Sequence, residues 1–205
     1  MTDVNGRALQ SGWDVRRNRR LAEYETAALQ LFAARGFREV TIDDVAEVAG
    51  VSSRTLFRYF PTKEDFLLGM PRRGTNRLAE RIGQLAPSDS PEQAAWDLIL
   101  QGYAMDPPDA TVMNLWRAAA AGAPEVVARV TGERLQTLYL ALADYFARSL
   151  GVDLADDPLP RVMAGGMVGV EHALIETLGR STADLPEIIE AASRALHVQP
   201  RRSNG

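Results

Sequence analysis

TIDDVAEVAGVSSRTLFRYF, residues 41–60, is the stretch of sequence that decides the fold. Thr41 followed three residues later by Asp44 has the pattern of a capping box, which predicts that a helix begins there. Gly50 can adopt the positive φ that ends this helix, and Ser52 can cap a second one. The stretch therefore predicts two short helices joined by a tight turn.

The same stretch has the pattern of a helix-turn-helix, which needs an apolar residue in the turn and a second helix with a free outer face. Val51 can fill the turn, and Ala46 is small enough to let the helices cross closely. Leu56 and Phe60 are expected to face inward. The residues left on the outer face are Ser53, Arg54, Phe57 and Arg58. An ordinary helical hairpin, whose outer face needs only to be soluble, is the alternative interpretation.

Helical periodicity runs through almost the whole chain, and no strand-like alternation persists. A loose tail is expected at 1–14, followed by a helix over about 15–35. A second capping box at Thr62 opens a fourth helix, which Pro71 should kink and which can resume as far as Leu85. The later helices are expected at about 91–105, 110–121, 124–150, 159–178 and 185–196.

This pattern predicts an all-α chain of about nine helices in two domains. The first, residues 1–68, is a three-helix domain with the helix-turn-helix, and the second, residues 69–205, is larger and helical. The chain has 205 residues, 46% of them hydrophobic, which is enough for cores in both domains. With no cysteine, disulfides and thiolate sites are excluded. No apolar run has the length of a signal peptide or a membrane helix, so we expect a cytoplasmic protein without a membrane partner.

Residues 41–68, with the preceding AALQLFAARGF of 27–37, closely resemble the DNA-binding signature of TetR-family regulators. The similarity covers roughly residues 20–68, a quarter of the chain, and the remainder agrees only in length and helical character. The resemblance implies a ligand-binding and dimerisation role for the second domain. It also implies a homodimer on a roughly palindromic operator in double-stranded DNA. The expected function is a ligand-responsive transcription regulator, a repressor released by a small apolar or amphipathic inducer, although activation stays open.

Position by position, the resemblance implies that two sets of residues bind DNA. The phosphate-binding residues would be Thr41, Thr55, Tyr59 and Lys63, and those in the major groove would be Ser53, Arg54, Phe57 and Arg58. Lys63, the only lysine, lies in the first turn of a predicted helix, where a cation is disfavoured but a phosphate would be attracted. Arg54 and Arg58 are four residues apart, and each can pair bidentately with guanine.

Two positions depart from the family pattern, and one basic cluster has two interpretations. Phe57 stands where the family commonly has Tyr, so it offers packing and no hydroxyl contact. Asp43 lies where some members carry a basic residue that reads bases, and no base contact is expected from it. The net charge of −4 means that DNA contacts must come from local clusters. The arginines of 16–20 are either a solvated helix start or an extension that reaches DNA.

Large aromatic residues and Met gather in the second domain, as suits a roomy apolar cavity. The resemblance implies a ligand pocket among these helices. The candidate ligand-binding residues are Trp96, Tyr103, Met113, Trp116, Tyr139, Met163, Met167 and His172. For each of them, plain core packing is the alternative, and His172 could equally be a satisfied core histidine.

The last two predicted helices carry apolar stripes suited to a four-helix bundle across a two-fold axis, which is the dimer that the resemblance implies. The candidate dimerisation residues are Met163, Val170, Leu174, Leu178, Leu185, Ile189 and Leu196. Three glycines, Gly165, Gly166 and Gly169, lie inside the first of these helices at a cost of about 1 kcal/mol each. Close approach of a partner helix or room for a ligand would explain them.

Two other classes of protein compete with a regulator. An enzyme is disfavoured because the chain has no cysteine and only two histidines, His172 and His197. His172 and Glu176 share a helix face, but two ligands do not make a metal site, so neither metal nor cofactor is expected. A helical adaptor that has lost DNA binding is the second rival, and the intact set of Thr55, Tyr59 and Lys63 disfavours it.

Overall fold

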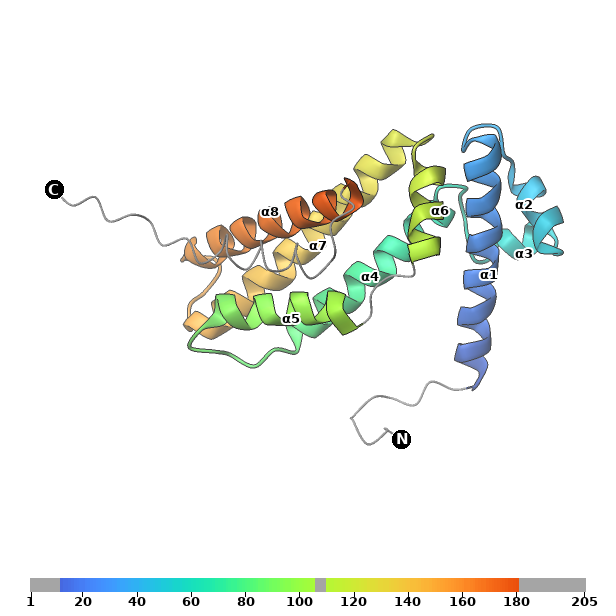
Figure 1. Cartoon of the computed structure of the whole chain (residues 1–205). Coiled ribbons are helices and arrows are strands. Elements are labelled where there is room, and N and C mark those ends of the chain that lie inside the picture. The colour runs from blue at the N-terminus through green and yellow to red at the C-terminus, as the bar shows by residue number, and fades with distance from the viewer. Residues whose placement is uncertain (1–11, 106–109, 181–205) are drawn as a thin grey trace. The chain divides into compact units, whose positions relative to one another are not determined.

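The computed structural model describes residues 12–105 and 110–180, and these ranges contain eight α-helices and no strand. The predicted all-α fold is therefore confirmed for this part of the chain (Figure 1). The predicted helix at 185–196 and most of the predicted tail lie outside the described residues. The helices are α1 Gly12–Arg35, α2 Ile42–Ala49, α3 Ser53–Phe57, α4 Asp65–Gly83, α5 Pro91–Met105, α6 Ala110–Ala120, α7 Pro124–Leu150 and α8 Leu159–Arg180.

The chain divides into two compact units. The first, here called the N unit, comprises residues 1–73 and 108–131, and the second, the C unit, comprises residues 74–107 and 132–205. Two of the three boundaries between the units along the chain fall inside α4 and α7. The N unit thus holds α6 and the start of α7 as well as the helix-turn-helix. The division by role, DNA binding in 1–68 and ligand binding with dimerisation in 69–205, stays a prediction.

The N unit is built on one aromatic core. Phe60 and Phe66 stack with ring centroids 4.1 Å apart, and Phe32 meets Phe37 edge-on at 5.0 Å. α1 packs against α2 and α6, and α2 packs against α3 (Figure 1). Aromatic pairs in these arrangements add to the free energy gained by burying their surface. The short helices α2 and α3, which would be unstable alone, are held by this core.

The C unit has its own core, formed by α5, α7, α8 and the second half of α4. Its buried side chains include Ile82, Trp96, Ile99, Leu138, Leu142, Tyr145, Phe146 and Met167. Arg134 of α7 forms an ion pair with the buried Glu171 of α8. Arg148 of α7 donates hydrogen bonds to the carbonyl oxygens of Gly83 (3.1 Å) and Leu85 (3.0 Å). Gly83 is the last residue of α4, where carbonyl oxygens lack a helical partner, so Arg148 caps that helix.

α4 runs without interruption through Pro71, so the break expected there is absent. Before the helix, the backbone N–H of Thr62 donates to the Asp65 carboxylate at 2.9 Å, which is one of the two bonds of the predicted capping box. Interior proline costs a helix about 3 kcal/mol or more. Phe66, Leu67 and Leu68 are buried just before it, and their packing helps to offset this cost. In the described ranges, no helix is long and apolar enough to cross a membrane.

Candidate nucleic-acid interface

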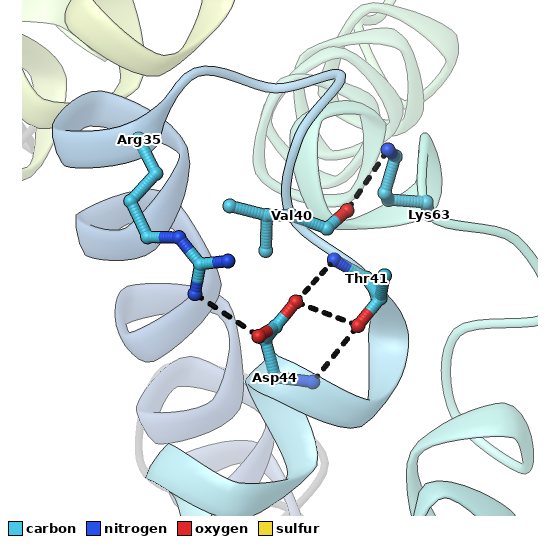
Figure 2. Close-up of polar contacts among 5 residues, drawn as sticks. All are labelled: Arg35, Val40, Thr41, Asp44 and Lys63. Atoms are coloured by element: carbon cyan, nitrogen blue, oxygen red, sulfur yellow. Dashed lines mark hydrogen bonds and ion pairs between the residues drawn. The ribbon is translucent and has the colours of Figure 1, made fainter.

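The start of α2 is fixed by the capping box that the sequence predicts. Thr41 has extended backbone (φ −98°, ψ 166°), and its hydroxyl accepts from the Asp44 N–H at 3.1 Å. The Asp44 carboxylate accepts in return from the Thr41 N–H at 2.7 Å and from its hydroxyl at 2.6 Å. Arg35, at the end of α1, donates to the other carboxylate oxygen at 3.0 Å (Figure 2). α2 is therefore anchored to α1 at its first turn.

These contacts change the acidity of Asp44. Hydrogen bonds from the Thr41 side chain and backbone, and then from Arg35, favour the charged carboxylate. Together they lower the pKa of Asp44 to about 2. The capping box is consequently charged, and intact, at any pH near neutrality.

The turn between α2 and α3 has the expected construction. Gly50 is left-handed (φ 65°), and its N–H donates to the carbonyl oxygens of Ala46 and Glu47. The Val51 N–H also donates to Ala46, at 3.0 Å, and the Val51 side chain packs against the core of the N unit. Ser52 then caps α3 by accepting from the Thr55 N–H at 3.2 Å. Glycine is favoured at position 50 because a side chain there would be strained.

The outer face of α3 leaves three of the four predicted groove residues exposed. Arg54, Phe57 and Arg58 are exposed, and Phe57 retains 50% of its surface although it is apolar. Ser53 is half-buried and donates to the Asp43 carboxylate of α2. Arg58 donates to the Tyr59 hydroxyl at 2.8 Å and lies over the Tyr59 ring. The two arginines and Phe57 thus offer donors and an apolar surface to the solvent.

The four predicted phosphate ligands differ in how far the fold already engages them. Thr41 is exposed, but its hydroxyl is held in the capping box. Thr55 is half-buried, with its hydroxyl 2.9 Å from that of Ser52. Tyr59 is half-buried, and its ring lies 6.2 Å from that of Tyr24 on α1. Thr41 is thus at the N-cap of α2, Thr55 is in α3, and Tyr59 is in the turn that follows α3.

Lys63 has contacts that its sequence position does not predict. Its ammonium donates to the carbonyl oxygens of Val40 (3.0 Å) and Arg38 (3.3 Å), and lies 4.6 Å from the centre of the Phe37 ring. Lys63 therefore ties the loop before α2 to the turn before α4 (Figure 2 shows the Val40 contact). An ammonium has three donors, so two carbonyl contacts leave one for a phosphate.

Sequence reasoning did not single out the exposed Val48 of α2, which retains 57% of its surface. The signal that could have identified Val48 is its position on the outer face of an amphipathic helix. It also missed the Asp43–Ser53 contact, because no pattern of local spacing predicts a side-chain bond between two helices. The arginines of 16–20 are exposed on α1, and Arg19 pairs with Glu23 at 3.1 Å. Whether this cluster touches DNA stays open.

The predicted ligand-binding residues do not fall in a single unit. Trp96, Tyr139, Met163 and Met167 belong to the core of the C unit. Two others, Met113 and Trp116, lie on α6 in the N unit. His172 is half-buried on α8, and the side chain of Tyr103 lies outside the described residues.

Of the predicted dimerisation residues, Met163 and Val170 are half-buried against the C-unit core. The side chains of Leu174 and Leu178, and all of Leu185, Ile189 and Leu196, lie outside the described residues. Within those residues, no cluster of three or more His, Asp or Glu could hold a metal ion.

Comparison with known proteins finds matches for the segment that carries this candidate interface. The family model for bacterial regulatory proteins of the tetR family matches residues 26–70. MftR of Mycobacterium tuberculosis, named a mycofactocin biosynthesis transcriptional regulator, is 56% identical over 36 residues, 18% of each chain. The HTH-type transcriptional regulator EthR of the same species is 32% identical over 100 residues, 49% of this chain and 38% of EthR. These alignments therefore span less than two fifths of either relative.

Among solved structures, a TetR-family transcriptional regulator from Syntrophomonas wolfei has a TM-score of 0.66 at 17% identity. The alignment covers 92% of this chain and 100% of that one. At this identity the likeness concerns the fold alone. Fold and matched segment together define an all-helical protein, in the described residues, whose helix-turn-helix resembles that of bacterial regulatory proteins. The match to the tetR family thus rests on residues 26–70, the part of the chain that carries the helix-turn-helix. The matched family is one of regulatory proteins and the named relatives are transcriptional regulators, in agreement with the sequence analysis.

Proposed function

We propose that the chain is a DNA-binding transcription regulator that acts as a homodimeric repressor. The observation that carries this proposal is the exposed face of α3, where Arg54 and the C-cap residue Arg58 lie on a helix that Ser52 caps and a buried core supports. A guanidinium fork on such a face can donate two hydrogen bonds to O6 and N7 of guanine. A regulator works where bacterial DNA lies, so a cytoplasmic location is part of the proposal.

Phosphate contacts would set the register of α3 on the duplex. Thr41, Thr55, Tyr59 and the remaining donor of Lys63 are the groups that we assign to this task. Contacts of this kind position the protein and carry no base information. The exposed Phe57 and Val48 would lie against sugars or thymine methyl groups, because these are the apolar surfaces that the grooves of DNA offer.

The C unit would hold the effector and the two-fold interface. Its core contains the Trp96 indole N–H and the Tyr145 hydroxyl, both buried and without a hydrogen-bond partner among the described residues. A buried donor left unsatisfied costs about 1–3 kcal/mol. A small apolar molecule with one hydrogen-bond acceptor could bind Trp96 and remove this cost. The preferred effector is thus amphipathic.

Release from DNA would follow if the effector binds one conformation of the dimer more tightly than the other. A coupling of about 1–3 kcal/mol is enough to lower operator affinity roughly 5- to 150-fold. Gly165, Gly166 and Gly169 of α8 support the dimer, since a Cβ at any of them would meet nothing within 4 Å in the single chain. A partner helix could approach closely over these positions.

The test is a selection of duplexes from a random library with the full chain, followed by binding measurements at several salt concentrations. We expect a preferred sequence of two inverted half-sites and an affinity that falls steeply with salt. An adaptor that has lost DNA binding would show neither. If the selection enriches no sequence and the retention of duplex DNA does not depend on salt, the proposed function is refuted.

A further inference from the structure

Pro71 leaves one carbonyl of α4 without its usual partner. In an α-helix, the oxygen of residue i accepts from the N–H of residue i+4, so the oxygen of Leu67 would accept from residue 71. Proline has no N–H. Leu67 itself is buried, and a buried carbonyl that loses a hydrogen bond destabilises the fold.

Trp116 of α6 supplies a donor to this carbonyl. Its indole Nε1–H donates to the Leu67 oxygen at 2.8 Å, an ordinary length for a good hydrogen bond. The Trp116 side chain is half-buried and packs against the core of the N unit. Since α6 also packs against α1, the indole connects α4 to the element that supports α1.

A second restraint holds α4 on the other side of Pro71. Arg73 donates to both carboxylate oxygens of Glu25 on α1, one of them at 2.7 Å, and Glu25 is only 5% exposed. Gly69 lies against this pair, and a Cβ there would collide with the Glu25 carboxylate. The stretch of α4 around Pro71 is therefore fixed both to α6 and to α1.

We infer that Trp116 is a positioning residue of the DNA-binding unit, whose indole N–H substitutes for the amide hydrogen that Pro71 lacks. Through this bond, α6 holds the first half of α4. The turn before α4 carries Lys63, which donates hydrogen bonds to two carbonyl oxygens of the loop leading into α2. A displaced α4 would therefore move the loop that carries Thr41. This role is distinct from the effector contact that the sequence analysis predicts for Trp116.

The stability test is a double-mutant cycle of Trp116→Phe and Pro71→Ala in the full chain, at one protein concentration. Trp116→Phe alone leaves the Leu67 oxygen unsatisfied, and we expect the unfolding equilibrium constant to rise about 5- to 150-fold. Pro71→Ala restores a backbone N–H to the helix. In that background, the rise in the unfolding equilibrium constant caused by Trp116→Phe should be at least about fivefold smaller than in the parent chain. Because the loss of ring volume is the same in both backgrounds, the cycle isolates the hydrogen bond.

Trp96→Phe is the matched control, since it replaces a buried tryptophan of the C unit with the same smaller ring. Its cost should be the same in the parent chain and in the Pro71→Ala background. Equal costs for Trp116→Phe in the two backgrounds would overturn the inference. Should Trp116→Phe fail to fold, the parent chain still gives a result by hydrogen exchange. The Trp116 indole N–H should exchange at least about tenfold more slowly than free tryptophan, and exchange at the free rate would overturn the assignment.

A DNA readout separates positioning from mere stabilisation, and this arm rests on the proposed function. Measured on fully folded protein, Trp116→Phe should weaken duplex binding several-fold, and Pro71→Ala should restore much of it. Unchanged binding by folded Trp116→Phe would contradict the positioning role even if the stability cycle holds. If the parent chain itself binds no duplex, the proposed function fails while the stability cycle still decides the hydrogen bond.

Discussion

Asp44 and Lys63 hold the loop before α2 from its two ends. Asp44 accepts from Thr41 and Arg35, while Lys63 donates to the carbonyls of Arg38 and Val40. Both side chains are charged, so the hydrogen bonds that they form with the loop are charge-assisted and stronger than neutral ones. The loop that presents Thr41 is consequently ordered before any DNA is bound.

The capping box predicts how stability responds to acid. The pKa of Asp44 is about 2 in the folded chain, and an unfolded Asp has a pKa of about 3.9. Below about pH 4 the unfolded state therefore binds more protons, and the contribution of Asp44 is lost as the pH falls from about 4 to 2. Urea unfolding of the parent and Asp44→Asn should differ most above pH 4 and converge toward pH 2. A difference that stays constant across this range would contradict the assignment.

Lys63→Met should have two separable effects. Removal of the ammonium deprives two carbonyls of a donor, and we expect a loss of about 1–2 kcal/mol in the free energy of unfolding. It should also weaken binding to all duplexes alike and reduce the salt slope by about one per protomer. Chemical denaturation and binding at several salt concentrations measure the two effects. An unchanged denaturation midpoint would mean that the carbonyl contacts contribute nothing.

At the scale of elements, α3 is the helix that we propose distinguishes one DNA sequence from another. Arg54→Ala or Arg58→Ala should cost about 1–3 kcal/mol at the selected operator and relax the base preference there. Binding to unrelated duplexes should fall much less. The exposed Arg77 of α4 lies in the C unit, and Arg77→Ala is the matched control. Operator affinity equal to that of the parent in both α3 variants would show that another element reads the bases.

α8 offers a test of the dimer. Gly169 is exposed, and a Cβ added there would meet nothing within 4 Å, so the single chain should tolerate Gly169→Leu and gain about 1 kcal/mol or less in helix propensity. In a dimer packed over α8, the same side chain would separate the partners. Light scattering should report a dimer for the parent and a monomer with unchanged helix content for the variant. A dimer of unaltered affinity would place the interface elsewhere.

The elements that the sequence predicts well are those set by neighbouring residues. The caps at Thr41 and Ser52, the turn at Gly50 and the extent of α5 to α7 depend on spacings of a few residues, which a single sequence displays. The continuity of α4 through Pro71 depends on packing and on Trp116, 49 residues from Leu67 in the chain. Contacts over such separations leave no local pattern, and the same is true of Lys63 and its carbonyls.

At the scale of the whole molecule, the order of the units along the chain matters for signalling. The chain passes from the N unit to the C unit within α4, returns for residues 108–131, and leaves again within α7. Two of these three crossings lie inside helices, which transmit displacement better than loops do. An effector in the C unit therefore has covalent routes to the helix-turn-helix through α4 and α7, as the proposed release from DNA requires.

The most direct test of DNA recognition by this chain is a hydroxyl-radical footprint of the full protein on its selected operator. A two-fold dimer with one α3 in each half-site should protect two patches centred about 34–36 Å apart, or roughly one helical turn. Arg54→Ala should lose both patches at a concentration where the parent gives them. Uniform cleavage at every protein concentration, or a single patch unaffected by Arg54→Ala, would contradict the account.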